Sequence, residues 1–207
     1  MPIALNGSGT ISGISVGGLP DGIVDTDMLA AGAVTAAKRG AGAILQVVST
    51  NYTGTSSVSV PNQSLADTPA TVTITSTAAN SKFLISAAIN GEPSSSDHDY
   101  GFVLRRVIGG SGTSINVGDS AGSRSQISFM QSTGYWADDN SSTPSTSVLA
   151  PYLDSPSQAA GTAITYKIAV TGLGTTATFY FGYTGSNLDN ANNERTPNHI
   201  TVMEVAA

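Results

Sequence analysis

The chain has 207 residues, which suits one good-sized domain or one domain with a short additional segment. Charged residues make up 11% of it, against roughly 25% in an ordinary soluble domain, and the net charge is −6. So few cations argue against nucleic acid, whose binding requires several neutralised phosphates, and against an anionic membrane surface. The absence of cysteine excludes disulfides, thiolate nucleophiles and Cys-ligated metal sites.

The beginning of the sequence carries no targeting signal of the familiar kinds. Met1 to Gly7 include neither a basic region nor an apolar run, so we expect no signal peptide. No window approaches the roughly 18 continuous apolar residues of a spanning helix, so we also expect no membrane insertion. A protein with the composition of an extracellular one and no secretion signal is typical of a virion component, made in the bacterial cytoplasm and released by lysis.

Residues 1–45 differ in composition from the rest of the chain, because they are rich in Gly, Ala, Ile and Val. The alternation in Gly9–Val16 predicts a short strand. Asp25-Thr26-Asp27 can cap a short helix from Met28 to about Lys38, with an apolar face of Met28, Leu29, Val34 and Ala37. Such a helix is too short to be stable alone. We therefore predict that this segment joins copies of the chain or attaches it to a particle; the alternative is packing against its own domain.

From about residue 44 the pattern changes to short strands separated by turns. The predicted strands are Ile44–Thr50, Thr55–Val60, Ala70–Thr75, Lys82–Asn90, Gly101–Ile108, Thr113–Val117, Gln126–Ser132, Ser147–Leu153, Ala163–Thr171, Ala177–Tyr183 and His199–Val205. Turn residues lie between them, as in Asn90–Pro93 and Gly109–Gly112. Many short strands with one apolar and one Thr-rich face predict an all-β fold, an antiparallel, jelly-roll-like β-sandwich head domain over residues 46–207.

Two long predicted loops, Thr133–Thr146 and Ser186–Asn198, interrupt the regular spacing of strands. Loops of this length in a compact domain are usually functional or packed against a neighbour. The first contains Tyr135, Trp136, Asp138, Asp139 and Asn140. Aromatic rings beside Asp and Asn suit a carbohydrate site, and Tyr and Trp also anchor protein interfaces. Three interpretations remain open: a sugar contact, a subunit interface, or a tryptophan packed into one end of the sandwich.

Nothing in the sequence forms a catalytic constellation, so we assign no catalytic, cofactor-binding or metal-binding residue. Asp97, His98 and Asp99 could hold a metal, but adjacent residues of an extended chain point to opposite sides, which favours a solvated loop. His199 has no near acidic neighbour and is predicted to have no role. Arg105-Arg106 lies in a predicted strand, so the two side chains should face opposite ways, one against a carboxylate at a subunit contact.

Several segments together resemble tail-fibre and other virion appendage proteins of tailed phages that infect cyanobacteria and other aquatic bacteria. The resemblance covers nearly the whole chain and is carried by a set of motifs that are weak singly. These are Gly9–Gly22, Val24–Ala30, Ala33–Lys38, Ile44–Val48, Ser81–Ile85, Leu104–Arg106, Gly118–Arg124, Tyr152–Pro156 and Ile200–Ala207. It implies a virion protein with a β-sandwich body that is commonly trimeric.

Together these observations predict a non-enzymatic virion protein without cofactors. We expect a homotrimeric tail-fibre or appendage subunit, with residues 1–45 contacting other virion proteins and the head domain contacting a glycan or protein on the bacterial surface. The alternative is a capsid decoration protein, a cement or head-fibre subunit that stabilises the shell by binding its assembled form. This alternative stays open because the chain is short for a complete tail fibre.

Overall fold

The computed structural model describes residues 33–35, 38–94, 100–130, 144–174 and 176–207. The chain divides into two compact units, Met1–Arg39 and Gly40–Ala207, and the second is all-β. Its strands are β1 (Ile44–Tyr52), β2 (Ser56–Val60), β3 (Ala66–Thr75), β4 (Lys82–Pro93), β5 (Tyr100–Ile108), β6 (Ser111–Ile115), β7 (Phe129–Met130), β8 (Ser145–Asp154), β9 (Ala163–Gly172), β10 (Ala177–Phe181) and β11 (Asn198–Val205). β1 therefore runs across the boundary expected at residue 45.

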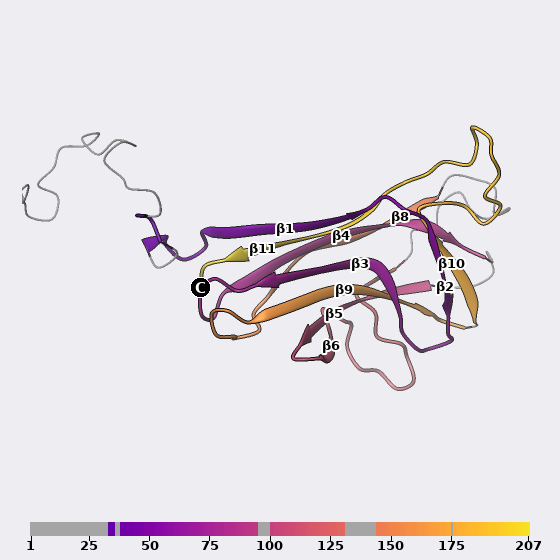
Figure 1. Ribbon diagram of the computed structural model, residues 1–207. Coiled ribbons are helices and arrows are strands. Elements are labelled where there is room, and N and C mark those ends of the chain that lie inside the picture. Colours follow the sequence, from indigo (N-terminus) through magenta and orange to yellow (C-terminus); the bar gives the residue numbers. More distant parts are fainter. Residues whose placement is uncertain (1–32, 36–37, 95–99, 131–143, 175) are drawn as a thin grey trace, which may run out of the picture. The chain divides into compact units, whose positions relative to one another are not determined.

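These strands form two antiparallel sheets packed face to face (Figure 1). In the first sheet, β4 pairs with β8 along one edge and with β11 and then β10 along the other. β1 and β2 complete this sheet by pairing with β11 and β10. In the second sheet, β9 lies between β3 and β5, and the free edge of β5 pairs with β6 and then β7. The predicted all-β antiparallel sandwich is confirmed.

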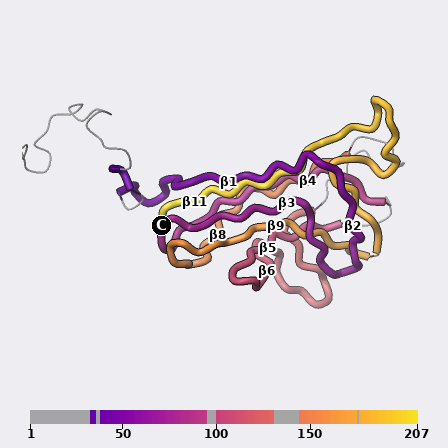
Figure 2. The backbone as a smooth tube through the Cα atoms, viewed as in Figure 1, coloured from indigo at the N-terminus to yellow at the C-terminus, as the bar shows by residue number. Residues whose placement is uncertain are grey.

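Three pairs of strands each occupy a single row of a sheet. β1 continues into β2, β6 into β7, and β10 into β11, with a loop inserted at each break. Counted along the chain, the described strands thus make eight rows. Rows 1, 8, 3 and 6 lie side by side in the first sheet, as β1/β2, β10/β11, β4 and β8. Rows 2, 7, 4 and 5 form the second sheet, as β3, β9, β5 and β6/β7. This is the jelly-roll order, built from two Greek keys. The smooth path in Figure 2 shows the chain crossing repeatedly between the layers.

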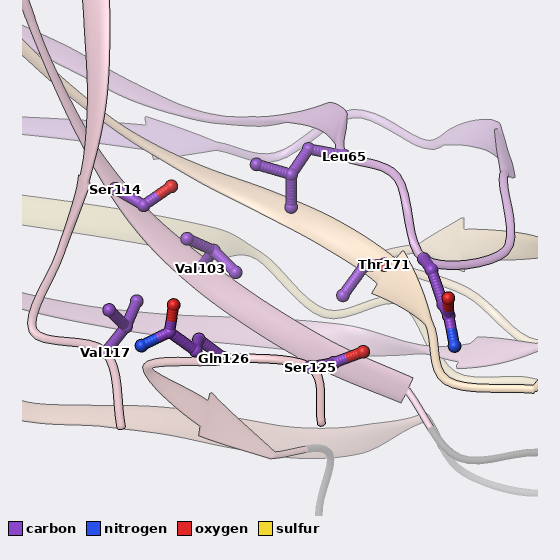
Figure 3. A pocket seen from close by; sticks show the side chains of 8 residues that line it. Leu65, Val103, Ser114, Val117, Ser125, Gln126 and Thr171 are labelled. Atoms are coloured by element: carbon purple, nitrogen blue, oxygen red, sulfur yellow. The ribbon is translucent and has the colours of Figure 1, made fainter. Parts of the chain in front are cut away.

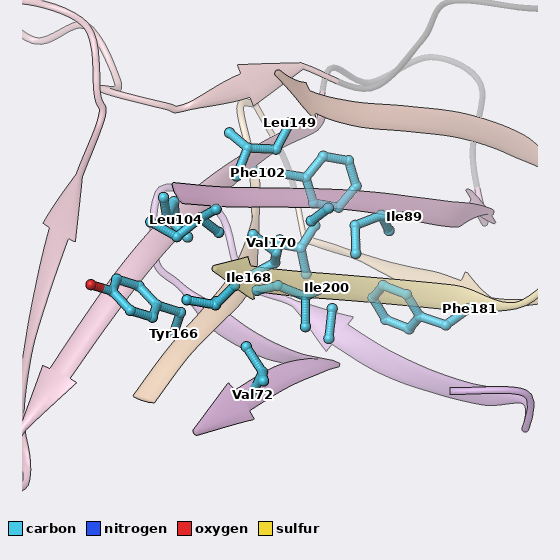
Figure 4. Packing of buried hydrophobic residues seen from close by; sticks show 14 of the residues in the cluster. Val72, Ile89, Phe102, Leu104, Leu149, Tyr166, Ile168, Val170, Phe181 and Ile200 are labelled. Carbon is cyan, nitrogen blue, oxygen red and sulfur yellow. The ribbon is translucent and has the colours of Figure 1, made fainter. Parts of the chain in front are cut away.

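The core lies between the sheets and follows from strict alternation along the strands. In β9 the inward residues are Ile164, Tyr166, Ile168 and Val170, all buried, and similar rows come from β3, β5 and β11 (Figure 4). At one end, the rings of Phe102 and Phe179 meet edge to face with centroids 5.6 Å apart and join the two sheets. Burying these large side chains provides the main driving force for the fold.

The two adjacent arginines of β5 face opposite sides of the second sheet, as predicted. Arg106 points inward, where its Nη1 lies 2.7 and 3.0 Å from the two carboxylate oxygens of Asp154. The buried hydroxyl of Tyr166 donates to the same carboxylate at 2.7 Å. Burial, and then this hydrogen bond, raise the pKa of Tyr166 well above its usual range, so the phenol stays protonated as a donor. The carboxylate belongs to the same chain, so the expectation of a subunit contact is wrong.

Some local predictions were wrong because tertiary packing overrides turn chemistry. Asn90–Pro93 reads as a turn but continues β4, where Gly91 lies against the backbone of Tyr180. Of the predicted strand Gln126–Ser132, only Phe129–Met130 is a strand within the described residues. The strand expected at Thr113–Val117 is shifted to Ser111–Ile115 and ends before Asn116, which has a φ of 54°. The turn before it is therefore confined to Gly109-Gly110.

We expect Gly91→Ala to lower the free energy of unfolding by about 3 kcal/mol, because overpacking of this kind costs roughly 1–3 kcal/mol or more. An added Cβ would lie 2.1 Å from the Tyr180 carbonyl oxygen and 2.5 Å from the Phe179 ring. Gly40→Ala is the matched control, since nothing lies within 4 Å of a Cβ there. Urea denaturation of both variants measures the difference; equal midpoints would contradict this packing.

We expect Arg106→Met to lower the free energy of unfolding by roughly 3–5 kcal/mol, because it leaves a buried carboxylate without its cation. Arg105→Met is the control: Arg105 pairs at 3.6 Å with Asp67, whose side chain is 50% exposed, and such pairs contribute roughly 0–1 kcal/mol. The double variant Arg106→Met/Asp154→Leu should recover much of the loss. Thermal denaturation giving equal losses for the two single variants would count against this assignment.

Candidate functional site

The residues singled out from the sequence fall mostly outside the described part of the chain. This holds for the whole aromatic loop motif of Tyr135, Trp136, Asp138, Asp139 and Asn140, and for Asp97, His98 and Asp99. Those predictions therefore stay predictions.

The structure tests one stretch of the predicted N-terminal helix. Met28, Leu29 and Ala37 lie outside the described residues, whereas Ala33, Val34 and Thr35 are described and are not helical. Val34 is 47% exposed. The prediction of a continuous helix to Lys38 is thus wrong at residues 33–35. β-Branched Val34 and Thr35 have low helix propensity, and a single short helix has too few hydrogen bonds to offset its nucleation cost.

Buried acidic groups of the sandwich serve its architecture. Glu204 on β11 accepts hydrogen bonds from Gln46 Nε2 at 2.6 Å and from the backbone amides of Thr77 and Ala78 at 2.8 and 3.2 Å. Burial alone would raise the pKa of Glu204, but these donors outweigh it and the pKa is lowered. The side chain therefore ties β11 to β1 and to the turn after β3 as a charged acceptor.

Metal binding and membrane crossing find no support within the described residues. They contain no group of three or more His, Asp or Glu side chains placed to share a metal ion. Nor do they contain a helix long and apolar enough to cross a membrane.

His199 is exposed on the outward side of β11, and Asn51 and Ala88 are its cross-strand neighbours. It pairs with no acidic side chain of the described residues.

Of the two long loops predicted from the sequence, the second lies wholly within the described residues. It is the insertion between β10 and β11, residues 182–197. It is organised around Asn193, whose Oδ1 accepts from the hydroxyls of Thr184 and Ser186 at 2.9 and 2.6 Å. Gly185 N also donates to Glu92 of β4 at 3.3 Å, which holds the loop to the sheet. Leu188 on this loop is exposed. The loop is a projection that these hydrogen bonds hold to the sheet.

A hollow of about 240 Å³ lies on the outward face of the second sheet and is the candidate binding site (Figure 3). Its floor is made by Val103 of β5 and Thr171 of β9, both buried. Val103 lies between the inward core residues Phe102 and Leu104, so its side chain points away from the core. Ser114 of β6 extends the floor from the next strand, as cross-strand partner of Arg105.

One wall of the hollow comes from the segment between β2 and β3, which contributes Gln63 and Leu65. This segment is pinned to the end of β9, because Gln63 N donates to Gly172 O at 2.9 Å and Gly172 N donates to Pro61 O at 3.2 Å. Gln63 has a φ of 53°, a left-handed conformation that the turn imposes. The wall is therefore set by backbone contacts rather than by its own side chains.

The opposite wall is the insertion between β6 and β7, residues 116–128, which contributes Val117, Ser125 and Gln126. Ser128 anchors its end: its Oγ donates to Ile115 O at 3.0 Å and accepts from Leu104 N at 2.8 Å. Gln126 Nε2 donates to Gly118 O at 2.6 Å and holds the loop across its base. Gly101 allows this loop to approach β5, since a Cβ there would lie 2.5 Å from the Ile127 side chain.

The chemistry of the hollow is neutral and mixed. Its hydrogen-bonding side chains are two amides and three hydroxyls, and its apolar surface comes from three aliphatic residues: Leu65, Val103 and Val117. No charged side chain lines it. A preformed concave site with apolar walls and a few converging polar groups is the usual form of a small-molecule site. Nothing in it supplies an acid, a base or a charged nucleophile.

Sequence reasoning missed this hollow because its lining comes from segments far apart in the chain. Gln63, Ser114, Gln126 and Thr171 carry no local motif, and only strand register brings them together. The loop 116–128 was read partly as strand, which hid the insertion that forms one wall. The polar cluster at residues 118–126 gave a weak signal, since it breaks the alternation expected of a strand.

Comparison with known proteins identifies no family for this chain. No protein-family model matches it, and no curated protein sequence matches it.

Proposed function

We propose that the chain is a non-enzymatic structural subunit of a virus particle, a homotrimeric tail-fibre or appendage protein of a tailed phage that contacts the host surface. The observation that carries the proposal is a jelly-roll sandwich, sparsely charged, that follows a separate compact unit of about 40 residues. Jelly rolls recur in capsid and lectin domains, but a fold alone does not assign a function. The resemblance of the sequence to phage appendage proteins supports the same proposal.

The outward face of the first sheet supports assembly with further copies of the chain. A row of four apolar residues crosses the sheet in register, with Val47 beside Met203, Met203 beside Leu84, and Leu84 beside Leu153. Val47 and Leu153 are 54% and 46% exposed. An apolar row that spans a sheet and remains open is a feature of interaction surfaces.

Charge favours a second copy as the partner of this face. Each chain carries a net charge of −6, so an interface between copies must avoid carboxylates. On β1, β11, β8 and the first half of β4, the outward residues of the described chain include only Lys82 and His199 as titratable groups. Ile44, at the start of β1, also faces outward and is exposed. The described part of this face can therefore meet its own copy without repulsion between carboxylates.

We expect the purified protein to have about three times the chain mass of 20.9 kDa by light scattering on a size-exclusion column. Val47→Lys/Leu153→Lys should shift it to the single-chain mass, because six added cations would be desolvated at a trimer contact. Thr75→Lys, an exposed change on the other sheet, is the matched control and should leave the mass unchanged. A clean single-chain mass for the unmodified protein at tens of micromolar would contradict the trimer.

Electron microscopy of phage particles labelled with a gold-conjugated antibody tests the location. We expect label on the tail or its fibres, and we expect the purified protein to reduce phage adsorption to host cells in a dose-dependent way. Label spread over the head surface would instead support the alternative of a capsid decoration protein. Particles without label in either place would overturn the virion assignment.

A further inference from the structure

We propose that the hollow on the second sheet binds one neutral sugar residue of a surface glycan. This inference rests on the proposed function for its biological setting, but it is argued from the geometry of the hollow alone. It concerns the lining residues Gln63, Leu65, Val103, Ser114, Val117, Ser125, Gln126 and Thr171. None of these lining residues belongs to the predicted aromatic motif around Trp136, which lies outside the described residues.

The size of the hollow limits the ligand to a single small unit. Its volume of about 240 Å³ lies below the roughly 300–1,000 Å³ typical of sites for drug-sized molecules. A single monosaccharide is the unit that we propose for this space. A longer chain would have to continue past the exposed rim formed by Ser125 and Gln126.

The lining chemistry selects a ligand with many neutral hydroxyls and some carbon surface. Amides such as those of Gln63 and Gln126 both donate and accept, and the hydroxyls of Ser114 and Ser125 do the same. A sugar hydroxyl also donates and accepts, so it can satisfy either kind of partner. Leu65, which is 40% exposed, and the half-buried Val117 offer an apolar surface for the C–H side of a ring. A purely apolar ligand would leave the polar groups unpaired at a cost.

The charged groups beside the hollow lie outside its lining, which is uncharged. Arg105, beside Ser114 on β5, pairs with Asp67 at 3.6 Å, and Lys167 lies 2.6 Å from the same carboxylate. Two cations against one carboxylate leave this cluster with a net charge of +1, but none of the three groups lines the hollow. Binding of a neutral ligand therefore requires no charge to be desolvated, which lowers the cost of binding.

The walls are preformed, which favours binding by a ring of fixed shape. Backbone hydrogen bonds from Gln63 and Gly172 hold one wall, and the contacts of Ser128 hold the other. A site that is already ordered loses little conformational freedom on binding. For a ligand of about twelve heavy atoms, typical ligand efficiency gives a Kd on the order of millimolar. An affinity this weak becomes effective when several copies bind together.

The test uses the full chain and saturation-transfer NMR with defined probes: glucose, galactose, mannose and N-acetylglucosamine, each at about 10 mM, with glucuronate as the anionic probe. We expect at least one neutral sugar to bind, and glucuronate to bind no better. Ser114→Phe should abolish binding by filling the hollow. Ser59→Phe, an exposed serine in β2 of the other sheet, should leave it unchanged. Gln63→Ala should weaken binding about two- to tenfold, the range for loss of a neutral hydrogen bond.

The outcomes separate this inference from the proposed function. No binding of any neutral sugar, unchanged binding in Ser114→Phe, or preference for glucuronate would overturn the assignment of the hollow, while gold label on phage tails would still support the appendage role. Conversely, sugar binding that disappears in Ser114→Phe together with unlabelled particles would preserve the hollow and overturn the virion assignment. Circular dichroism of each variant, matched to the unmodified protein, shows that loss of binding is not loss of the fold.

Discussion

Burial of one face of each sheet against the other is the constraint on which the rest of this structure depends. Every second residue of the long strands is committed to that core, so the remaining residues face outward and are free to vary in chemistry. The chain uses this freedom differently on its two sheets. The first sheet presents a sparsely charged face with an apolar row from Val47 to Leu153. The second presents a Thr-rich face with a hollow bounded by two loops.

The hollow exists because a row of the second sheet is interrupted. β6 and β7 lie along the same edge of β5, and the chain between them, residues 116–128, has no place in the sheet. It folds back over the outward face and is held there by Ser128 and by the absence of a side chain at Gly101. The insertion between β10 and β11 arises in the same way. Interrupted rows thus add surface features without disturbing the jelly-roll core.

The strands were predictable because alternation is a local property of the sequence, and the jelly-roll class follows from their number and spacing. Asn90–Pro93 was misread because turn residues describe local preference, whereas the pairing of Gly91 with Phe181 depends on a strand ninety residues away. The opposite orientations of Arg105 and Arg106 were predictable from strand geometry; the partner Asp154 was not. For the hollow, no short segment holds the signal, since its lining depends on the register of β5, β6 and β9.

The low content of charged residues affects both outward faces of the sandwich in the same way. If the proposed contact with a host surface is made, a net charge of −6 provides little long-range attraction to an anionic surface. Recognition must then come from short-range hydrogen bonding and apolar contact, which are weak at a single small hollow. Weak contacts hold a particle when several act at once, and the gain depends on how rigidly the copies are spaced. Joining copies through a sheet face, rather than through a flexible segment alone, would supply that rigidity and make a millimolar site sufficient.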